Sequence, residues 1–160
     1  GISGITDDNV LVLLKNTTAD EAIQKGVRDA VSWGPFLIVN GVKSIVSGNG
    51  GWGGGARSAI GQRKDGTLLF LQVGSNSYRT NGAGMEDLVE IMARYGAYNA
   101  ANLDGGTSSV LVVRRADAIN KYNATCHDYF TNYACAINDP IDALGVHRTR
   151  YISDAWVVVE

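Results

Sequence analysis

Short apolar runs separated by turn signals predict several strands along this chain. Residues 9–14 form an apolar run typical of a buried strand. A second run occupies residues 36–39, and Asn40-Gly41 after it is a strong hairpin-turn signal before a third strand at 42–46. These runs are bounded by turn residues, so we expect them to be strands and not parts of one long helix.

Helical spacing occurs in two places. Thr18 and Glu21 have the spacing of a capping box, which predicts the start of a helix there. Apolar residues then fall on one predicted helical face at Ala22, Ile23, Val27, Ala30 and Val31. A second amphipathic helix is predicted from Met85, Leu88, Val89, Met92 and Tyr95, with Gly96 as its C-cap.

The remaining pattern completes an α+β domain. Residues 56–62 and 67–73 are expected to pair as a hairpin, and a strand at 98–103 follows the second helix. This strand–helix–strand order favours a parallel, right-handed crossover. Polar, irregular sequence fills 114–150, and 155–159 resembles a last buried strand. We therefore expect a single domain over residues 1–160, with a mixed β-sheet and two main flanking helices.

Polar groups concentrate where the strand at 98–103 ends. The stretch from Asn102 to Ser109 holds one carboxylate, two glycines and three hydroxyls between an apolar and a β-branched segment. Asp104 enters the Gly105-Gly106 turn, and ligands of α/β sheets gather beyond the carboxyl ends of strands. The N–H groups of Gly105, Gly106 and Thr107 suit an anion-binding nest. The alternative is a structural Asx-turn capped by Asp104.

Arginines supply the matching positive charge. Arg57 stands among small residues on a hairpin strand, where a planar guanidinium could bind a carboxylate or phosphate or form a structural ion pair. Arg148 and Arg150 add charge near the C-terminus. The glycine-rich segment 48–55 is either a flexible surface loop or a rim whose Trp52 stacks on a sugar.

Composition narrows the class of protein. The chain has 160 residues and a formal net charge of −2, which argues against a nucleic-acid partner. No apolar run approaches the roughly 20 residues that span a bilayer, so no membrane span is expected. Cys126 and Cys135 predict either a disulfide in an oxidising compartment or two free thiols. Zinc-ligand spacing is absent, His127 and His147 are expected at the surface, and no cofactor is expected.

Taken together, several motifs resemble the phosphodiester glycosidase family, including its bacterial exopolysaccharide-related members. The matching residues are Gly34-Pro35-Phe36-Leu37-Ile38-Val39-Asn40-Gly41, Arg57-Ser58-Ala59-Ile60-Gly61-Gln62, Asp65-Gly66, Asp87-Leu88, the run from Tyr95 to Gly106, and Arg150-Tyr151-Ile152-Ser153-Asp154-Ala155. The order and spacing of the motifs, over residues 25–160, carry the resemblance.

The resemblance implies hydrolysis of a sugar-1-phosphodiester in an envelope polymer or glycan, outside the cell or at its surface. It makes Asp104 the reacting carboxylate, as base or nucleophile, and Arg57 the phosphate clamp. Phosphate is a good leaving group, so an arginine and one carboxylate could suffice. The expected substrate pocket is lined by Asn40, Gly41, Trp52, Asn102, Gly105, Gly106, Thr107, Ser108 and Arg150.

The chain also departs from the family pattern. Gly74-Ser75-Asn76 stands where the family has Asp-Gly-Arg, and the family's N-terminal motif is absent. A catalytically inactive carbohydrate-binding module of the same fold is therefore the alternative function. A third reading is a processed piece whose site a further segment completes.

Overall fold

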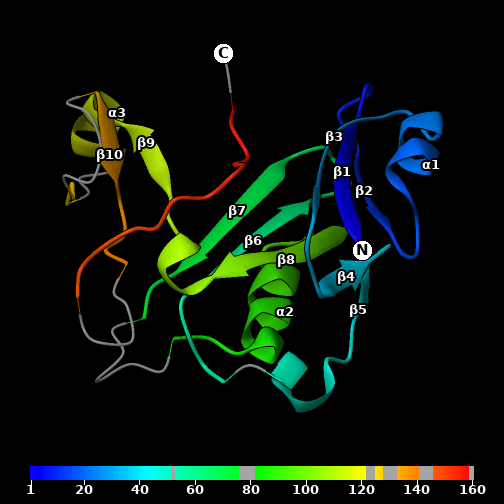
Figure 1. The fold of residues 1–160 in the computed structure, drawn as a ribbon, viewed down its shortest axis with the longest axis horizontal. Coiled ribbons are helices and arrows are strands. Elements are labelled where there is room, and N and C mark those ends of the chain that lie inside the picture. The colour runs from blue at the N-terminus through cyan, green and yellow to red at the C-terminus, as the bar shows by residue number, and fades with distance from the viewer. Residues whose placement is uncertain (52, 76–81, 122–124, 128–132, 141–145, 159–160) are drawn as a thin grey trace.

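A five-stranded sheet, a three-stranded sheet and a two-stranded sheet make up the described part of the fold, with three α-helices (Figure 1). The computed structural model describes residues 1–51, 53–75, 82–121, 125–127, 133–140 and 146–158. The predicted α+β class is confirmed. No helix within these residues is long and apolar enough to cross a bilayer.

The elements have the following bounds. The strands are β1 (Ile2–Thr6), β2 (Leu11–Leu14), β3 (Val27–Ser32), β4 (Phe36–Val39), β5 (Val42–Lys43), β6 (Arg57–Gln62), β7 (Leu68–Val73), β8 (Asn99–Gly105), β9 (Val112–Arg114) and β10 (Ala134–Ala136). The helices are α1 (Ala19–Gln24), α2 (Met85–Arg94) and α3 (Arg115–Asn120), with 3-10 turns η1 (Ser47–Gly51) and η2 (Gly106–Ser108).

Strand β8 lies at the centre of the five-stranded sheet, whose order is β5-β4-β8-β6-β7. Each neighbouring pair in this sheet is antiparallel, including the predicted hairpin in which Arg57 faces Val73 and Gln62 faces Leu68. Strands β7 and β8 therefore run in the same direction but are separated by β6. The predicted parallel crossover through α2 passes over that intervening strand.

Helix α2 covers one face of this sheet (Figure 1). Its predicted apolar face is buried at Met85, Leu88, Val89 and Met92, which pack against residues of β4, β6 and β8. The helix ends at Arg94, and Gly96 takes the left-handed conformation with φ of +80°. Tyr95, predicted on the apolar face, lies at this end and is 58% exposed.

The helix predicted from Thr18 is shorter than its apolar periodicity indicates. The capping box between Thr18 and Glu21 is confirmed, but α1 ends at Gln24. Gly26 has a φ of +77°, which reverses the chain, and residues 27–32 form β3 against β1. The prediction of a helix through Val31 is therefore wrong, because β1, which the apolar pattern did not reveal, provides a strand partner.

Two polar side chains connect the three-stranded sheet to the five-stranded sheet. Gln62 Oε1 accepts from the Leu11 N–H at 2.7 Å, and its Nε2 donates to Asn9 O at 2.8 Å and to Gly66 O at 3.0 Å. Asn99 Nδ2 donates to Leu11 O at 2.9 Å. These amides satisfy backbone groups at the start of β2 and so fix its position beside β8.

The structure corrects two further strand predictions and one prediction of irregular structure. The strand predicted at 42–46 is limited to β5, and Ile45 is 96% exposed. The region 114–150 was expected to be irregular, yet it contains α3 and β10. Residues 155–158 are not a strand, and Val157 and Val158 are exposed. Their apolar sequence finds no strand partner among the described residues.

Replacing Gln62 with alanine should destabilise the protein by about 2 kcal/mol, because the buried Leu11 N–H loses its acceptor and the part-buried bond to Asn9 O is also lost. Gln24→Ala, on the exposed last position of α1, is the matched control and should change the free energy of unfolding by no more than about 0.5 kcal/mol. Denaturant titration measures both. Equal effects in the two variants would contradict the bridging role of Gln62.

Candidate functional site

Asp104 lies near the end of β8, where it is held by a backbone and a side-chain contact. Its Oδ1 accepts from the Gly105 N–H at 2.8 Å, and its Oδ2 pairs with the Arg150 guanidinium. The Asp104 side chain is 33% exposed, and that of Arg150 is 56% exposed. The C-terminal segment therefore passes beside the end of β8 (Figure 1), and the carboxylate remains accessible to a ligand.

Arg57 begins β6 directly opposite Gly105 in the register of the two strands. Its Nη2 donates to Gly53 O at 2.6 Å, and its buried Nε has no hydrogen-bond partner. Burial lowers the pKa of the Arg57 guanidinium below its ordinary value, but arginine stays protonated at neutral pH. A charged donor that lacks partners is suited to an anion.

No hydrogen bond or ion pair joins Arg57 to Asp104 among the residues that the structure describes. The two side chains start from positions one residue apart in the register of β6 and β8. The alternative role of Arg57, a structural ion pair with a loop carboxylate, stays a prediction, and the Asp104 carboxylate pairs with Arg150. Arg150 thus pairs with the carboxylate near the end of β8, while Arg57 packs on the neighbouring Gly105.

The close approach of Arg57 requires glycine at position 105. A Cβ atom on Gly105 would lie 2.9 Å from Ala56 O and 2.9 Å from Arg57 Nη1. The next residue, Gly106, has a φ of +62°, a conformation that favours glycine, and its N–H donates to Ala56 O at 3.0 Å. The two glycines therefore bring the turn against the backbone and guanidinium of β6.

The predicted anion nest is only partly available. The N–H groups of Gly105 and Gly106 already donate to Asp104 Oδ1 and Ala56 O. Thr107 and Ser108 continue into η2, where Ser108 is 9% exposed and its buried Oγ has no partner. Asp104 Oδ1 accepts from the next residue, Gly105, whereas an Asx-turn would use the Gly106 N–H, which donates to Ala56 O; the second oxygen of Asp104 pairs with Arg150.

Asn102 is a buried structural contact of the Gly34-Pro35 segment. The residue is 2% exposed, its Nδ2 donates to Gly34 O at 2.9 Å, and its N–H donates to Pro35 O at 3.0 Å. The Gly34-Pro35 peptide bond is cis. The role of Asn102 in lining the substrate pocket stays a prediction; the structure shows its side chain buried, with Nδ2 bonded to Gly34 O and Oδ1 without a hydrogen-bond partner.

Asn40 and Gly41 lie at the other end of β8. Both have positive φ in the turn between β4 and β5, and their N–H groups donate to Asn99 Oδ1 and Tyr98 O. Asn99 precedes Asp104 by five residues, about 16 Å along a strand. The structure thus does not bring Asn40 or Gly41 to Asp104. Trp52 lies outside the described residues.

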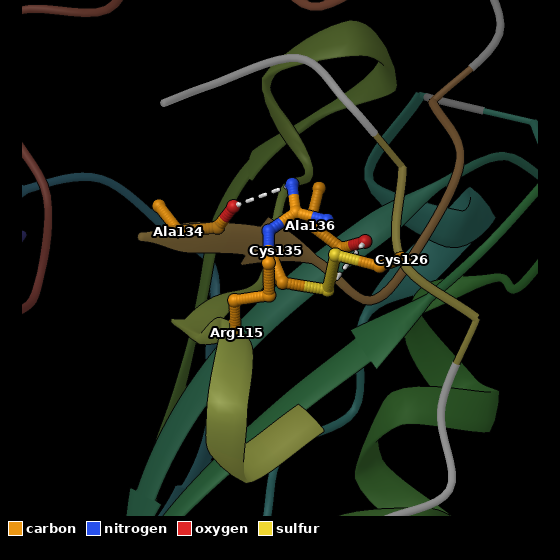
Figure 2. Close-up of a disulfide and its surroundings, with 5 residues drawn as sticks. All are labelled: Arg115, Cys126, Ala134, Cys135 and Ala136. Carbon is orange, nitrogen blue, oxygen red and sulfur yellow. Dashed lines mark hydrogen bonds between the residues drawn. A yellow bond between two sulfur atoms is a disulfide. The ribbon is translucent and has the colours of Figure 1, made fainter. Parts of the chain in front are cut away.

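The predicted disulfide between Cys126 and Cys135 is present, with a Cα–Cα distance of 5.2 Å. Cys135 is in β10, which pairs with β9, and Figure 2 shows Arg115 donating to Ala134 O beside it. The N–H of His127 donates to Ala136 O at 3.0 Å. The cross-link therefore attaches the Cys126 segment to the small sheet that follows η2.

One polar residue near the site was not singled out by the sequence. Asn138 Oδ1 accepts from the Leu111 N–H at 2.8 Å, and its Nδ2 donates to Ser109 O at 2.6 Å. The residue belongs to Asn138-Asp139-Pro140, a turn signal that could have drawn attention to it. In the described segments, no group of three or more acidic, histidine or cysteine side chains could hold a metal ion.

Comparison with known proteins assigns the chain to a family. The family model for phosphodiester glycosidases matches residues 1–159. The chain belongs to the phosphodiester glycosidase family. The match extends the resemblance found in the sequence, which began at residue 25, to the N-terminal strands.

Individual relatives of this chain match over part of their length. The SPbeta prophage-derived uncharacterized protein YomE of Bacillus subtilis (strain 168) is 34% identical over 113 residues, 67% of this chain and 17% of the relative. The zebrafish N-acetylglucosamine-1-phosphodiester alpha-N-acetylglucosaminidase catalytic domain, auto-inhibited by its pro-peptide, has a TM-score of 0.56 at 23% identity, over 68% of this chain and 40% of that chain. This likeness shows a shared fold. The chain spans less than half the length of both relatives.

Gly105→Ala should disturb both the turn and the arginine, because the added methyl group meets Ala56 O and Arg57 Nη1. We expect a loss of about 1–3 kcal/mol in the free energy of unfolding. Gly74→Ala is the matched control, since a Cβ atom there has no neighbour within 4 Å. Denaturant titration compares the two. A Gly105→Ala variant as stable as Gly74→Ala would contradict the close approach.

Proposed function

We propose that this chain hydrolyses a sugar-1-phosphodiester, of the N-acetylglucosamine-1-phosphodiester kind, in an envelope polymer or glycan. Family membership supports the reaction class. The observation that carries the proposal is the ion pair of Asp104 with Arg150 at the end of β8, beside the Gly105 turn on which Arg57 packs. The name of the zebrafish neighbour includes N-acetylglucosamine-1-phosphodiester, which is therefore the first substrate to test.

In the proposed reaction, water replaces the phosphate at C1 of the sugar. The C1–O bond breaks, its electron pair stays on the leaving phosphomonoester, and a new C1–O bond forms to the water oxygen. The proton lost by water goes to a base. The phosphomonoester gains negative charge as it leaves, and fixed cations stabilise charge that develops in a transition state.

In this proposal, the two arginines stabilise the negative charge of the phosphate group. Arg57 is held against Gly105 and Gly53, so its guanidinium is the proposed pre-organised phosphate clamp. Arg150 is more exposed and pairs with Asp104 before substrate binds. A phosphodiester at the strand end would offer Arg150 a second anion and release part of the carboxylate.

Asp104 is the reacting carboxylate of the proposal, as base or as nucleophile. A base that activates water inverts the configuration at C1, whereas a carboxylate that forms a glycosyl intermediate retains it. Proton NMR of freshly released sugar therefore distinguishes the two roles. Hydrolysis in ¹⁸O-water adds a second test, because attack at C1 puts the label in the sugar and attack at phosphorus puts it in the phosphate.

A carbohydrate-binding module without activity is the second candidate function. It is favoured by Gly74-Ser75-Asn76, which replaces the family's Asp-Gly-Arg directly after β7. Sugar binding without turnover on several phosphodiesters would support it. We also propose that the protein works outside the cell or at its surface, because a disulfide such as Cys126–Cys135 persists in oxidising compartments.

Asp104→Asn should lower kcat/KM for the methyl phosphodiester of N-acetylglucosamine-1-phosphate on the order of 10⁴-fold, because a neutral amide is neither base nor nucleophile. Released sugar is the measured product. Asp65→Asn is the matched control, since Asp65 also accepts a turn N–H, from Thr67 at 3.0 Å, but lies at the opposite end of β6. Unchanged turnover in Asp104→Asn would remove this residue from the chemistry.

Arg57→Ala should weaken binding of the phosphorylated ligand more than binding of free N-acetylglucosamine, because the clamp contacts phosphate and not sugar. We expect a loss on the order of 10²-fold for the phosphodiester, in line with removal of one charged donor. Isothermal titration with both ligands measures the difference. Arg63→Ala, at the turn after β6, is the control. Equal losses for the two ligands would exclude a phosphate clamp.

A further inference from the structure

The C-terminal segment that carries Arg150 has no regular secondary structure between residues 148 and 158. Arg150 is itself long and exposed, so holding it on Asp104 costs conformational entropy. Some contact upstream must therefore hold the segment beside β8. Two neighbouring residues, Asp139 and Pro140, supply that contact.

The first half of the connection runs from the glycine turn to Asn138. The amide of Asn138 bonds to Ser109 O and to the Leu111 N–H, and the N–H of Ile137 donates to Leu111 O at 3.0 Å. Ser109 in turn directs its Oγ to Asp104 O at 3.4 Å. The position of residues 137–138 is thus set by the backbone that follows the proposed reacting carboxylate.

The second half runs from Asp139 to the C-terminal segment. His147 Nδ1 lies 2.5 Å from Asp139 Oδ2, and His127 Nδ1 lies 3.8 Å from the same oxygen. The Arg148 N–H donates to Pro140 O at 3.0 Å. A side-chain contact and a backbone hydrogen bond therefore fix two successive residues, and Thr149 alone separates them from Arg150.

We infer that Asp139 is a positioning residue that delivers Arg150 to Asp104. The inference rests on the proposed function and extends it. The contacts connect Asp104 to Asn138 through Ser109, and Asp139 to His147. Arg150, three residues after His147, then pairs with Asp104. Asp139 does not touch the reacting groups. It acts by holding the segment in which the guanidinium is anchored.

The test is a double-mutant cycle between Asp139 and Arg150, with turnover of the methyl phosphodiester of N-acetylglucosamine-1-phosphate as the readout. Asp139→Ala should lower kcat on the order of 10-fold, because a catalytic cation displaced by even 1 Å can cost up to about 10²-fold. Asp139→Asn keeps an acceptor for His147 and should lose less. In an Arg150→Gln background, Asp139→Ala should change kcat by less than about 2-fold, because the residue through which it acts is gone.

Asp29→Ala is the matched control. Asp29 is also a partly exposed aspartate in an ion pair, with Arg28 at 2.7 Å, but it lies in β3 of the three-stranded sheet. Its loss should leave kcat unchanged in both backgrounds. Thermal unfolding of every variant separates misfolding from misplacement.

A second readout is independent of activity. The guanidinium nitrogen resonances of Arg150, assigned by their absence in Arg150→Gln, should differ from those of a free arginine in the unaltered protein. They should move toward the free values in Asp139→Ala and stay in place in Asp29→Ala. This measurement tests the positioning role even if no sugar phosphodiester is hydrolysed, an outcome that would overturn the proposed function alone.

The inference would be overturned if Asp139→Ala lowered kcat by the same factor in the unaltered protein and in the Arg150→Gln variant. That result would leave the hydrolase proposal intact. An Arg150 guanidinium spectrum that Asp139→Ala does not alter would also overturn the inference.

Discussion

The pairing of β8 on both edges is the constraint on which the rest of the structure depends. Its register with β6 sets Gly105 opposite Arg57, and its register with β4 sets Ala101 opposite Phe36. Helix α2 covers the same sheet, and the amides of Gln62 and Asn99 hold the second sheet to its start. A shift of β8 by one residue would therefore change the position of the Asp104 carboxylate, the contact of Gly105 with Arg57 and the packing of the core at the same time.

Elements with local signals were predictable from the sequence. The amphipathic face of α2, the hairpin of β6 and β7, and the capping box at Thr18 depend on residues close in the chain, and the structure confirms them. The prediction for residues 27–32 was wrong because Val27, Ala30 and Val31 fall at helical spacing, whereas the strand puts Ala30 on the face opposite to Val27 and Val31. Only the pairing with β1, about 25 residues away, decides between them, and that information is not local.

The residues of the candidate site also differ in whether local sequence could predict them. The sequence identified Asp104, Gly105 and Gly106 as candidate site residues, because an acid and two glycines pack poorly in a core and are typical of a turn. Asn40 could not be placed, since its hairpin resembles the site in composition but lies at the other end of β8. Asn138 was missed for a related reason: its amide matters only because β10 returns the chain to Ser109 and Leu111.

The two arginines differ in a way that suits the proposed reaction. Arg57 is partly buried, packs on a glycine that admits no side chain, and is fixed by Gly53 O, so its charge is already in place. Arg150 is exposed and already has an anionic partner in Asp104. A phosphodiester carries one negative charge, and the departing phosphomonoester gains a second. Cations therefore contribute more to the transition state than to the bound substrate. A fixed arginine can bind the substrate while an arginine that exchanges partners responds to the charge that develops. In such a site, the ion pair with Asp104 is the resting contact that the bound phosphodiester weakens and the more highly charged phosphomonoester weakens further.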